Sequence, residues 1–259
     1  MGITILVFSF LLLSQPQAGI SDLQKEEQAL FEKRGNPEDL NALIDVYQKI
    51  LSLEPRNEQY WIKLSYAYYF AGYFVEKERK KRIELLSKCM ETANKAKELD
   101  PDSLEGNYWH VTCHGELTIV RGVLLGGFKI GESLKGLNVV AAKNIKYHYG
   151  GTYRFWGRFI WALPWLIRKV ADIDLGDSVY FYNKAIEINP DYIEPYFYMA
   201  ESYLRMGRFK DARKKLEWIM NFPIEKAPEF APENIIYKNW AEELYKKEFT
   251  KAGRDENEL

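Results

Sequence analysis

Four short segments of the chain end in a similar way, each with a proline that closes a helical pattern. Because proline lacks an amide proton and clashes with the preceding turn, it marks the point at which a helix must stop. The chain is therefore expected to consist of helices of similar length, interrupted at recurring positions. The four segments are Ile50–Pro55, Ala96–Pro101, Ala185–Pro190 and, more weakly, Ile219–Pro223.

Aromatic and small residues recur in phase with these prolines. A helix–turn–helix unit of about 34 residues with aromatic, small and proline markers is typical of the tetratricopeptide (TPR) repeat. One such repeat cannot bury its apolar face alone, so several must stack to form a core. The matching series are Trp61, Leu64, Tyr68 and Gly72, and then Tyr196, Met199, Tyr203 and Gly207.

The quality of the repeat varies along the chain. The match is strong over 193–223 and good over 60–101, where 73–84 is an insertion after the turn glycine. We predict an all-α fold, a TPR-like solenoid of helical hairpins with divergent central helices and a C-terminal capping helix over 228–247. The expected divisions are a signal peptide at 1–18, N-terminal TPR-like helices at 19–103, a divergent section rich in glycine and aromatic residues at 104–172, C-terminal TPR repeats at 173–223, and the capping helix with a charged tail at 224–259.

The N-terminus begins with an apolar run, Ile3–Leu13, that is followed by small and polar residues. The run is shorter than the roughly 20 residues that span a bilayer, so it is interpreted as a secretory signal cleaved after Ala18. The alternative is a first helix docked in the core. No cysteine lies near the cleavage region, so we expect a periplasmic or exported protein that is soluble after cleavage and not a lipoprotein at this site.

Composition excludes several classes of protein. There are 36 Lys and Arg residues against 37 Asp and Glu, which argues against nucleic-acid binding. Hydrophobic residues make up 47% of the chain, which excludes a mainly disordered protein. Two cysteines can form neither a disulfide scaffold nor a four-cysteine zinc site.

The middle of the chain departs from the repeat. Ten of the 17 glycines fall within 106–157, which predicts close backbone approach or an open space beside the helices. An apolar run over 117–127 is expected to form a soluble helix that borders this space. No acidic residue lies between Glu132 and Asp172, whereas basic residues occur at Lys135, Lys143, Lys146, Arg154, Arg158, Arg168 and Lys169.

Arg154 and Arg158 are spaced i and i+4, so they share one face of a helix and could hold a carboxylate or a phosphate. Two alternatives remain open. The arginines could pair with acids elsewhere in the solenoid, or this stretch of Trp and Arg could lie at a membrane interface.

The motif over 149–158, Tyr-Gly-Gly-Thr-Tyr-Arg-Phe-Trp-Gly-Arg, resembles the Gly-Gly-Pro-Tyr-Arg-x-x-Gly signature of the TatT family, with Thr152 in place of the usual proline. TatT proteins are TPR-type T-components of tripartite ATP-independent periplasmic (TRAP) transporters. The resemblance implies an all-helical periplasmic accessory protein with a pore or cleft among its helices. It also implies a periplasmic solute-binding protein as partner, a small, apolar-bodied, anionic ligand, and a possible homo-oligomer.

The first helices of a TPR stack line its concave side, and aromatic grooves there bind peptides or apolar ligands. Two functions are therefore considered: a T-component-like accessory of solute uptake, and a peptide- or protein-binding TPR scaffold of the cell envelope with no small-molecule role. The candidate ligand-binding residues are Arg154, Arg158, Tyr149, Gly150, Gly151, Tyr153, Tyr66, Tyr69, Phe70 and Tyr108.

Signals for chemistry are few. His110 and His114 have a spacing that can grip zinc from a helix, with Cys113 or Glu116 as a third ligand, but structural histidines are the commoner case at such inward positions. Cys89 could pair with Cys113 in a disulfide, or both could be buried thiols. No nucleophile or phosphate-loop motif occurs, so neither an enzyme nor a cofactor or metal is predicted.

Overall fold

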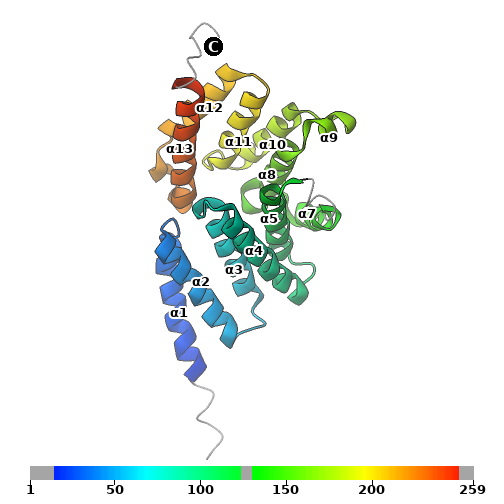
Figure 1. Cartoon of the computed structure of the whole chain (residues 1–259). Helices are drawn as coiled ribbons and strands as arrows, with labels where there is room; N and C mark the ends of the chain where they lie inside the picture. The colour runs from blue at the N-terminus through cyan, green and yellow to red at the C-terminus, as the bar shows by residue number, and fades with distance from the viewer. Residues whose placement is uncertain (1–14, 124–129, 251–259) are drawn as a thin grey trace, which may run out of the picture.

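A computed structural model describes residues 15–123 and 130–250, and within these ranges it contains helices and no strand. The all-α, TPR-like solenoid is confirmed (Figure 1). The helices are α1 (Gln15–Glu32), α2 (Pro37–Leu53), α3 (Glu58–Phe70), α4 (Arg79–Leu99), α5 (Leu104–Arg121), α7 (Ile130–Asn144), α8 (Tyr147–Ala162), α9 (Trp165–Val170), α10 (Leu175–Ile188), α11 (Glu194–Arg205), α12 (Phe209–Asn221) and α13 (Ala231–Tyr245), with a π-helical turn η1 (Ala71–Val75) after α3.

The recurring prolines end the helices as expected. In α2, α4 and α10 the last helical residue stands two positions before the proline. The residue in between leaves the helical region, with φ of −127° at Glu54, −140° at Asp100 and −142° at Asn189. Proline disfavours the α conformation of the residue before it, which explains why the three ends look alike.

Most consecutive helices pack side by side along the stack, α9 being the exception, and the stack curls until its two ends meet. Figure 1 shows α13 on the same side of the molecule as α1 and α2. The turn before α2 meets the start of α13, where the buried Arg34 side chain lies 2.7 Å (Nη2) from Glu233 Oε2. The Tyr66 hydroxyl donates to the other oxygen of Glu233 at 2.5 Å. The solenoid is therefore closed by a buried ion pair that joins its N-terminal and C-terminal helices.

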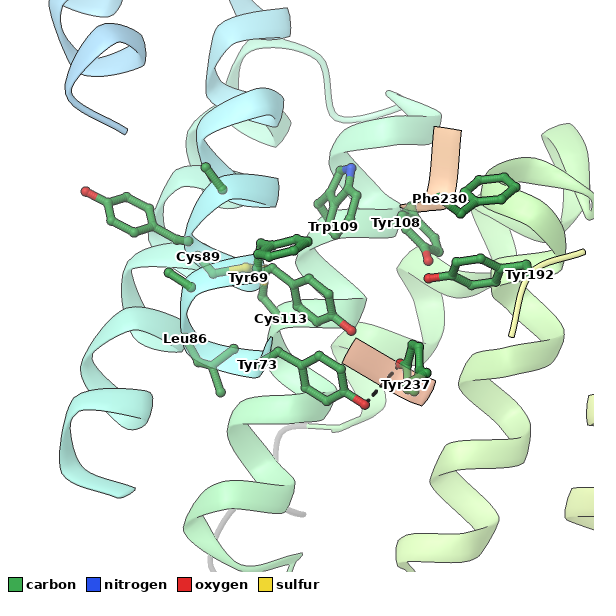
Figure 2. Close-up of a cluster of buried hydrophobic side chains, with 14 of the residues drawn as sticks. Tyr69, Tyr73, Leu86, Cys89, Tyr108, Trp109, Cys113, Tyr192, Phe230 and Tyr237 are labelled. Carbon is green, nitrogen blue, oxygen red and sulfur yellow. Dashed lines mark hydrogen bonds between the residues drawn. A yellow bond between two sulfur atoms is a disulfide. The ribbon is translucent and has the colours of Figure 1, made fainter. Parts of the chain in front are cut away.

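Aromatic side chains dominate the core, and four of the largest fully buried ones are Tyr47, Phe70, Tyr182 and Tyr237. The Tyr237 hydroxyl on α13 lies 3.3 Å from that of Tyr73 in η1 (Figure 2). The turn glycine Gly72 and the first residues of the predicted insertion thus lie in η1, which places the rings of Tyr73 and Phe74 against the last helix.

Cys89 on α4 and Cys113 on α5 form a disulfide with Cα atoms 5.7 Å apart (Figure 2). Of the two alternatives that the sequence allows, a disulfide or two buried thiols, the structure contains the disulfide. Both residues are fully buried, so the bond ties two neighbouring helices together from inside the core.

Two expectations fall partly outside the described residues. The signal peptide at 1–18 lies mostly within 1–14, and α1 begins at Gln15. The apolar run from Leu117 does not continue as one helix, because α5 ends at Arg121 and Gly122 adopts a φ of 104°. In the described part of the chain, no helix combines the length and the hydropathy needed to cross a membrane.

We predict that Glu233→Ala lowers the free energy of unfolding by about 3 kcal/mol, because it leaves the buried Arg34 guanidinium without its counterion. Urea denaturation measures the change. Glu229→Ala is the matched control, since the Glu229 side chain is exposed and only its backbone carbonyl accepts from Arg34. Equal losses in the two variants would contradict the closing role of the ion pair.

Candidate functional site

The closed stack encloses a small pocket among its aromatic side chains, here called the inner pocket. Its volume is about 80 Å³, and α3, α5 and α8 supply most of its wall. Gly115 and Gly151 border it, which agrees with the expectation that the glycine-rich helices leave a space beside them. Its lining side chains include Tyr69, Trp109, Glu116, Phe155, Arg158 and Phe159.

A larger opening, the outer cleft, lies between the first three helices and the segment before α13. Its volume is about 430 Å³, and it shares Tyr66, Trp109, His148, Tyr192 and Glu233 with the inner pocket. A second groove of about 710 Å³ continues from it along α1 and α13 and shares four residues with it, Glu27, Phe31, Arg34 and Glu229. The concave side thus offers a groove that deepens towards the molecular interior.

Arg154 is buried behind this cleft. Both of its terminal nitrogens are paired with the chain's own groups, whereas its Nε has no hydrogen-bond partner among the described residues. It forms an ion pair with Glu194 and donates to the Tyr108 hydroxyl at 3.0 Å and to His148 Nδ1 at 2.8 Å. Burial, together with the positive charge of Arg154, holds the pKa of His148 well below its usual range. His148 is therefore a neutral ring whose Nδ1 accepts a hydrogen bond from Arg154.

Arg158 lies at the polar end of the inner pocket. Its Nε is 3.4 Å from Glu116 Oε1, and its Nη1 is 3.9 Å from Glu201 Oε2. Burial raises the pKa of both glutamates, and the charge of Arg158 acts in the opposite direction. Within the described chain, Arg158 Nη1 and Glu116 Oε2 are buried without a hydrogen-bond partner. Arg158 and Glu116 thus leave one donor and one acceptor without a hydrogen bond at this end of the pocket.

The two arginines share a helix, as their spacing predicts, but they face different carboxylates. This arrangement matches the alternative in which acids elsewhere in the solenoid pair with them. The acids come from α5 and α11 and belong to no local motif, so local patterns in the sequence cannot identify them as the partners.

The Gly-Gly motif allows two helices to approach closely. A Cβ at Gly151 would lie 2.3 Å from the Tyr108 ring, and one at Gly150 would lie 3.1 Å from the Ala185 backbone. Gly150 also has a φ of 73°, and the two residues before it are left-handed as well, His148 at 48° and Tyr149 at 60°. Since L-residues avoid this region, the surrounding contacts must hold the turn in place.

The structure brings together most of the candidate ligand-binding residues. Tyr66 lines both spaces, Tyr149 lines the outer cleft, and Tyr69, Tyr108, Gly151, Arg154 and Arg158 line the inner pocket. Phe70 is fully buried in the core, Gly150 packs on α10, and the ring of Tyr153 lies beside that of Phe181, so these three line neither space.

The two helical histidines hold no obvious metal site. The disulfide occupies Cys113, which removes one of the candidate third ligands. His114 Nδ1 lies 2.6 Å from Ser133 Oγ, and the described residues contain no group of three or more metal-ligating side chains.

Fold and pocket together define a TPR-type helical protein. A model of the family "Regulator of microtubule dynamics protein 1-3" matches residues 24–247, so the chain belongs to this family. Among solved structures, the chain is similar to PilW, a type IV pilus biogenesis factor, with a TM-score of 0.51 and 14% identity over 93% of this chain and 96% of that one. It is also similar to MamA, with a TM-score of 0.40 and 20% identity over 81% and 92%. No curated protein matches.

These findings support a TPR-type fold without supporting membership of the TatT family. The likeness to PilW concerns the fold alone, because the identity is low.

We predict that Gly151→Ala lowers the free energy of unfolding by about 1–3 kcal/mol, because the new methyl group overlaps the buried Tyr108 ring. Gly131→Ala, on α7 with no atom within 4 Å of the added Cβ, is the matched control and should raise stability by a few tenths to about 1 kcal/mol. Thermal or urea unfolding compares the two. A neutral Gly151→Ala would show that the contact with α5 is not required.

Proposed function

We propose that this chain is a TPR-type interaction scaffold that holds an extended segment of a partner protein in the outer cleft. The observation that carries the proposal is the cleft itself: about 430 Å³, on the concave side, with aromatic walls that end in two partly exposed rings, Phe31 and Tyr149. Concave surfaces of this kind bind peptides through apolar anchors, with polar groups setting their orientation.

The residues of the cleft suggest what such a segment contains. Phe31 and Phe230 line the cleft, and an apolar or aromatic side chain of the bound segment can pack against them. Glu229 and Glu32 are exposed on the adjoining groove, whereas Glu27 is already paired with Lys63 at 2.6 Å. An anchor next to a basic residue would complement this rim.

An oxidising, exported setting is part of the proposal. Disulfides persist in oxidising compartments, so the buried disulfide supports this setting. It also agrees with the interpretation of the N-terminal apolar run as a secretory signal. The partner is then a protein of the cell envelope. The solute-binding protein that the resemblance to TRAP components implies would be one such partner, but the family match does not favour it over other envelope proteins.

A library of random peptides, selected on the full chain, tests the scaffold. We predict enrichment of an apolar or aromatic residue flanked by Lys or Arg, with micromolar affinity for the selected peptides. Phe31→Ser should weaken binding about tenfold, since it removes the exposed wall of the cleft. Leu53→Ser is the control, because Leu53 is a comparably exposed residue outside the cleft. Failure to enrich any sequence, or equal effects of the two variants, contradicts the proposal.

A second function has its own supporting observation, the inner pocket. Its walls are aromatic, and its polar end holds the unused donor of Arg158 and the unused acceptor of Glu116. We propose, as the alternative, that it binds a small apolar-bodied ligand whose head group both accepts and donates a hydrogen bond. A bare anion fits less well, because each arginine already has a carboxylate partner.

Native mass spectrometry of the purified full chain tests this alternative. We predict a retained small molecule that is lost when Phe155→Trp fills the pocket, because Phe155 lines it. Phe209→Trp, at the start of α12 and outside the pocket, is the matched control. A mass equal to that of the bare chain, before and after the substitution, would leave the inner pocket without a ligand role.

A further inference from the structure

The short helix α9 projects from the stack at the end of α8 and is poorly covered by its neighbours (Figure 1). Its six residues follow Pro164 and include four large apolar side chains. Val170 is 83% exposed, Trp165 66% and Leu166 57%, and Ile167 is also exposed. The other exposed large apolar residues of the described chain are more scattered, so this concentration on one projection requires an explanation.

The charges at this tip are positive. Arg168 and Lys169 lie within α9, and Lys169 Nζ is 5.9 Å from the centre of the Trp165 ring. The nearest acids along the chain, Asp172, Asp174 and Asp177, follow the helix rather than lie within it. Of these, Asp174 and Asp177 are engaged in the capping box of α10. The apolar side chains of α9 are therefore accompanied by cations, with no acid between Glu132 and Asp172.

We propose that α9 docks the protein onto an anionic lipid bilayer. Tryptophan prefers the boundary between head groups and acyl chains, aliphatic side chains enter that boundary, and adjacent Lys and Arg side chains reach the lipid phosphates. Trp165, Leu166 and Val170 supply the apolar part, and Arg168 and Lys169 supply the charge.

The form of the tip favours a membrane over a protein partner. A stable protein interface buries about 800 Å² on each side, which is more than a six-residue projection presents. One side of the tip borders an open groove of about 480 Å³ towards the start of α10, whereas the grooves with aromatic walls suited to protein segments lie among α1, α3 and α13. The docking surface is thus separate from the proposed interaction cleft, so the two proposals can fail independently.

A fluorescent label at a single position of the full chain tests this docking. Both native cysteines are in the disulfide, so Val170→Cys introduces the one free thiol, which is then labelled with an environment-sensitive fluorophore. With vesicles of phosphatidylcholine and phosphatidylglycerol, we predict a blue shift and a severalfold increase in emission. Vesicles of phosphatidylcholine alone should give a smaller response, and added salt should weaken the response to the anionic vesicles.

Two controls separate the tip from any other membrane contact of the same chain. Leu53→Cys, labelled in the same way, should not respond, because Leu53 is exposed on α2. In the chain labelled at position 170, adding Trp165→Ser and Lys169→Gln should weaken vesicle binding by about tenfold or more. The matched pair, Leu99→Ser and Lys214→Gln on other helices, should leave it unchanged.

Three results would overturn the proposal. The first is no change at position 170 with either vesicle, and the second is an equal change at positions 53 and 170. The third is a change at position 170 that depends on protein concentration without vesicles, because it would assign the tip to contact between copies of the chain.

Discussion

The buried ion pair between Arg34 and Glu233 joins the two ends of the helical stack. An open TPR stack presents its concave side to solvent along its whole length, whereas here the first and last helices meet and cover part of that side. A buried ion pair gains strength only when its geometry is good and its remaining polar atoms are satisfied. Tyr66 meets that condition by donating to Glu233, and the same residue lines both the inner pocket and the outer cleft. Closure and the candidate site therefore depend on one set of contacts.

Inside the closed stack, the buried ion pairs join different helices or turns. Arg154 links α8 to α11 through Glu194 and to α5 through Tyr108. Such links are selective, because an unpaired charge in the interior costs several kcal/mol. They specify which helix stands beside which in a fold whose repeats otherwise resemble one another. Arg158 Nη1 and Glu116 Oε2 are among the buried polar atoms of the described chain that lack a hydrogen-bond partner, and both residues line the inner pocket.

The architecture could be predicted from local patterns, since Pro55, Pro101 and Pro190 act on their own neighbours in the chain. The glycines also predict close backbone approach at Gly150–Gly151, but they do not identify the Tyr108 ring as the neighbouring group. The pairing of Arg154 with Glu194 could not be foreseen, because the two residues are 40 positions apart and lie on different repeats. The closure of the stack by Arg34 and Glu233 could not be predicted either. It depends on the summed curvature of all the helices and joins residues 199 positions apart.

The disulfide between Cys89 and Cys113 has a consequence for the hollow interior. Cys113 lies on α5 between Thr112 and Gly115, both of which line the inner pocket. The bond anchors this wall to α4, on the side away from the cavity. The shape of the inner pocket is therefore coupled to the redox conditions around the protein. In the reduced chain, the α5 wall of the pocket would be more flexible than in the oxidised chain.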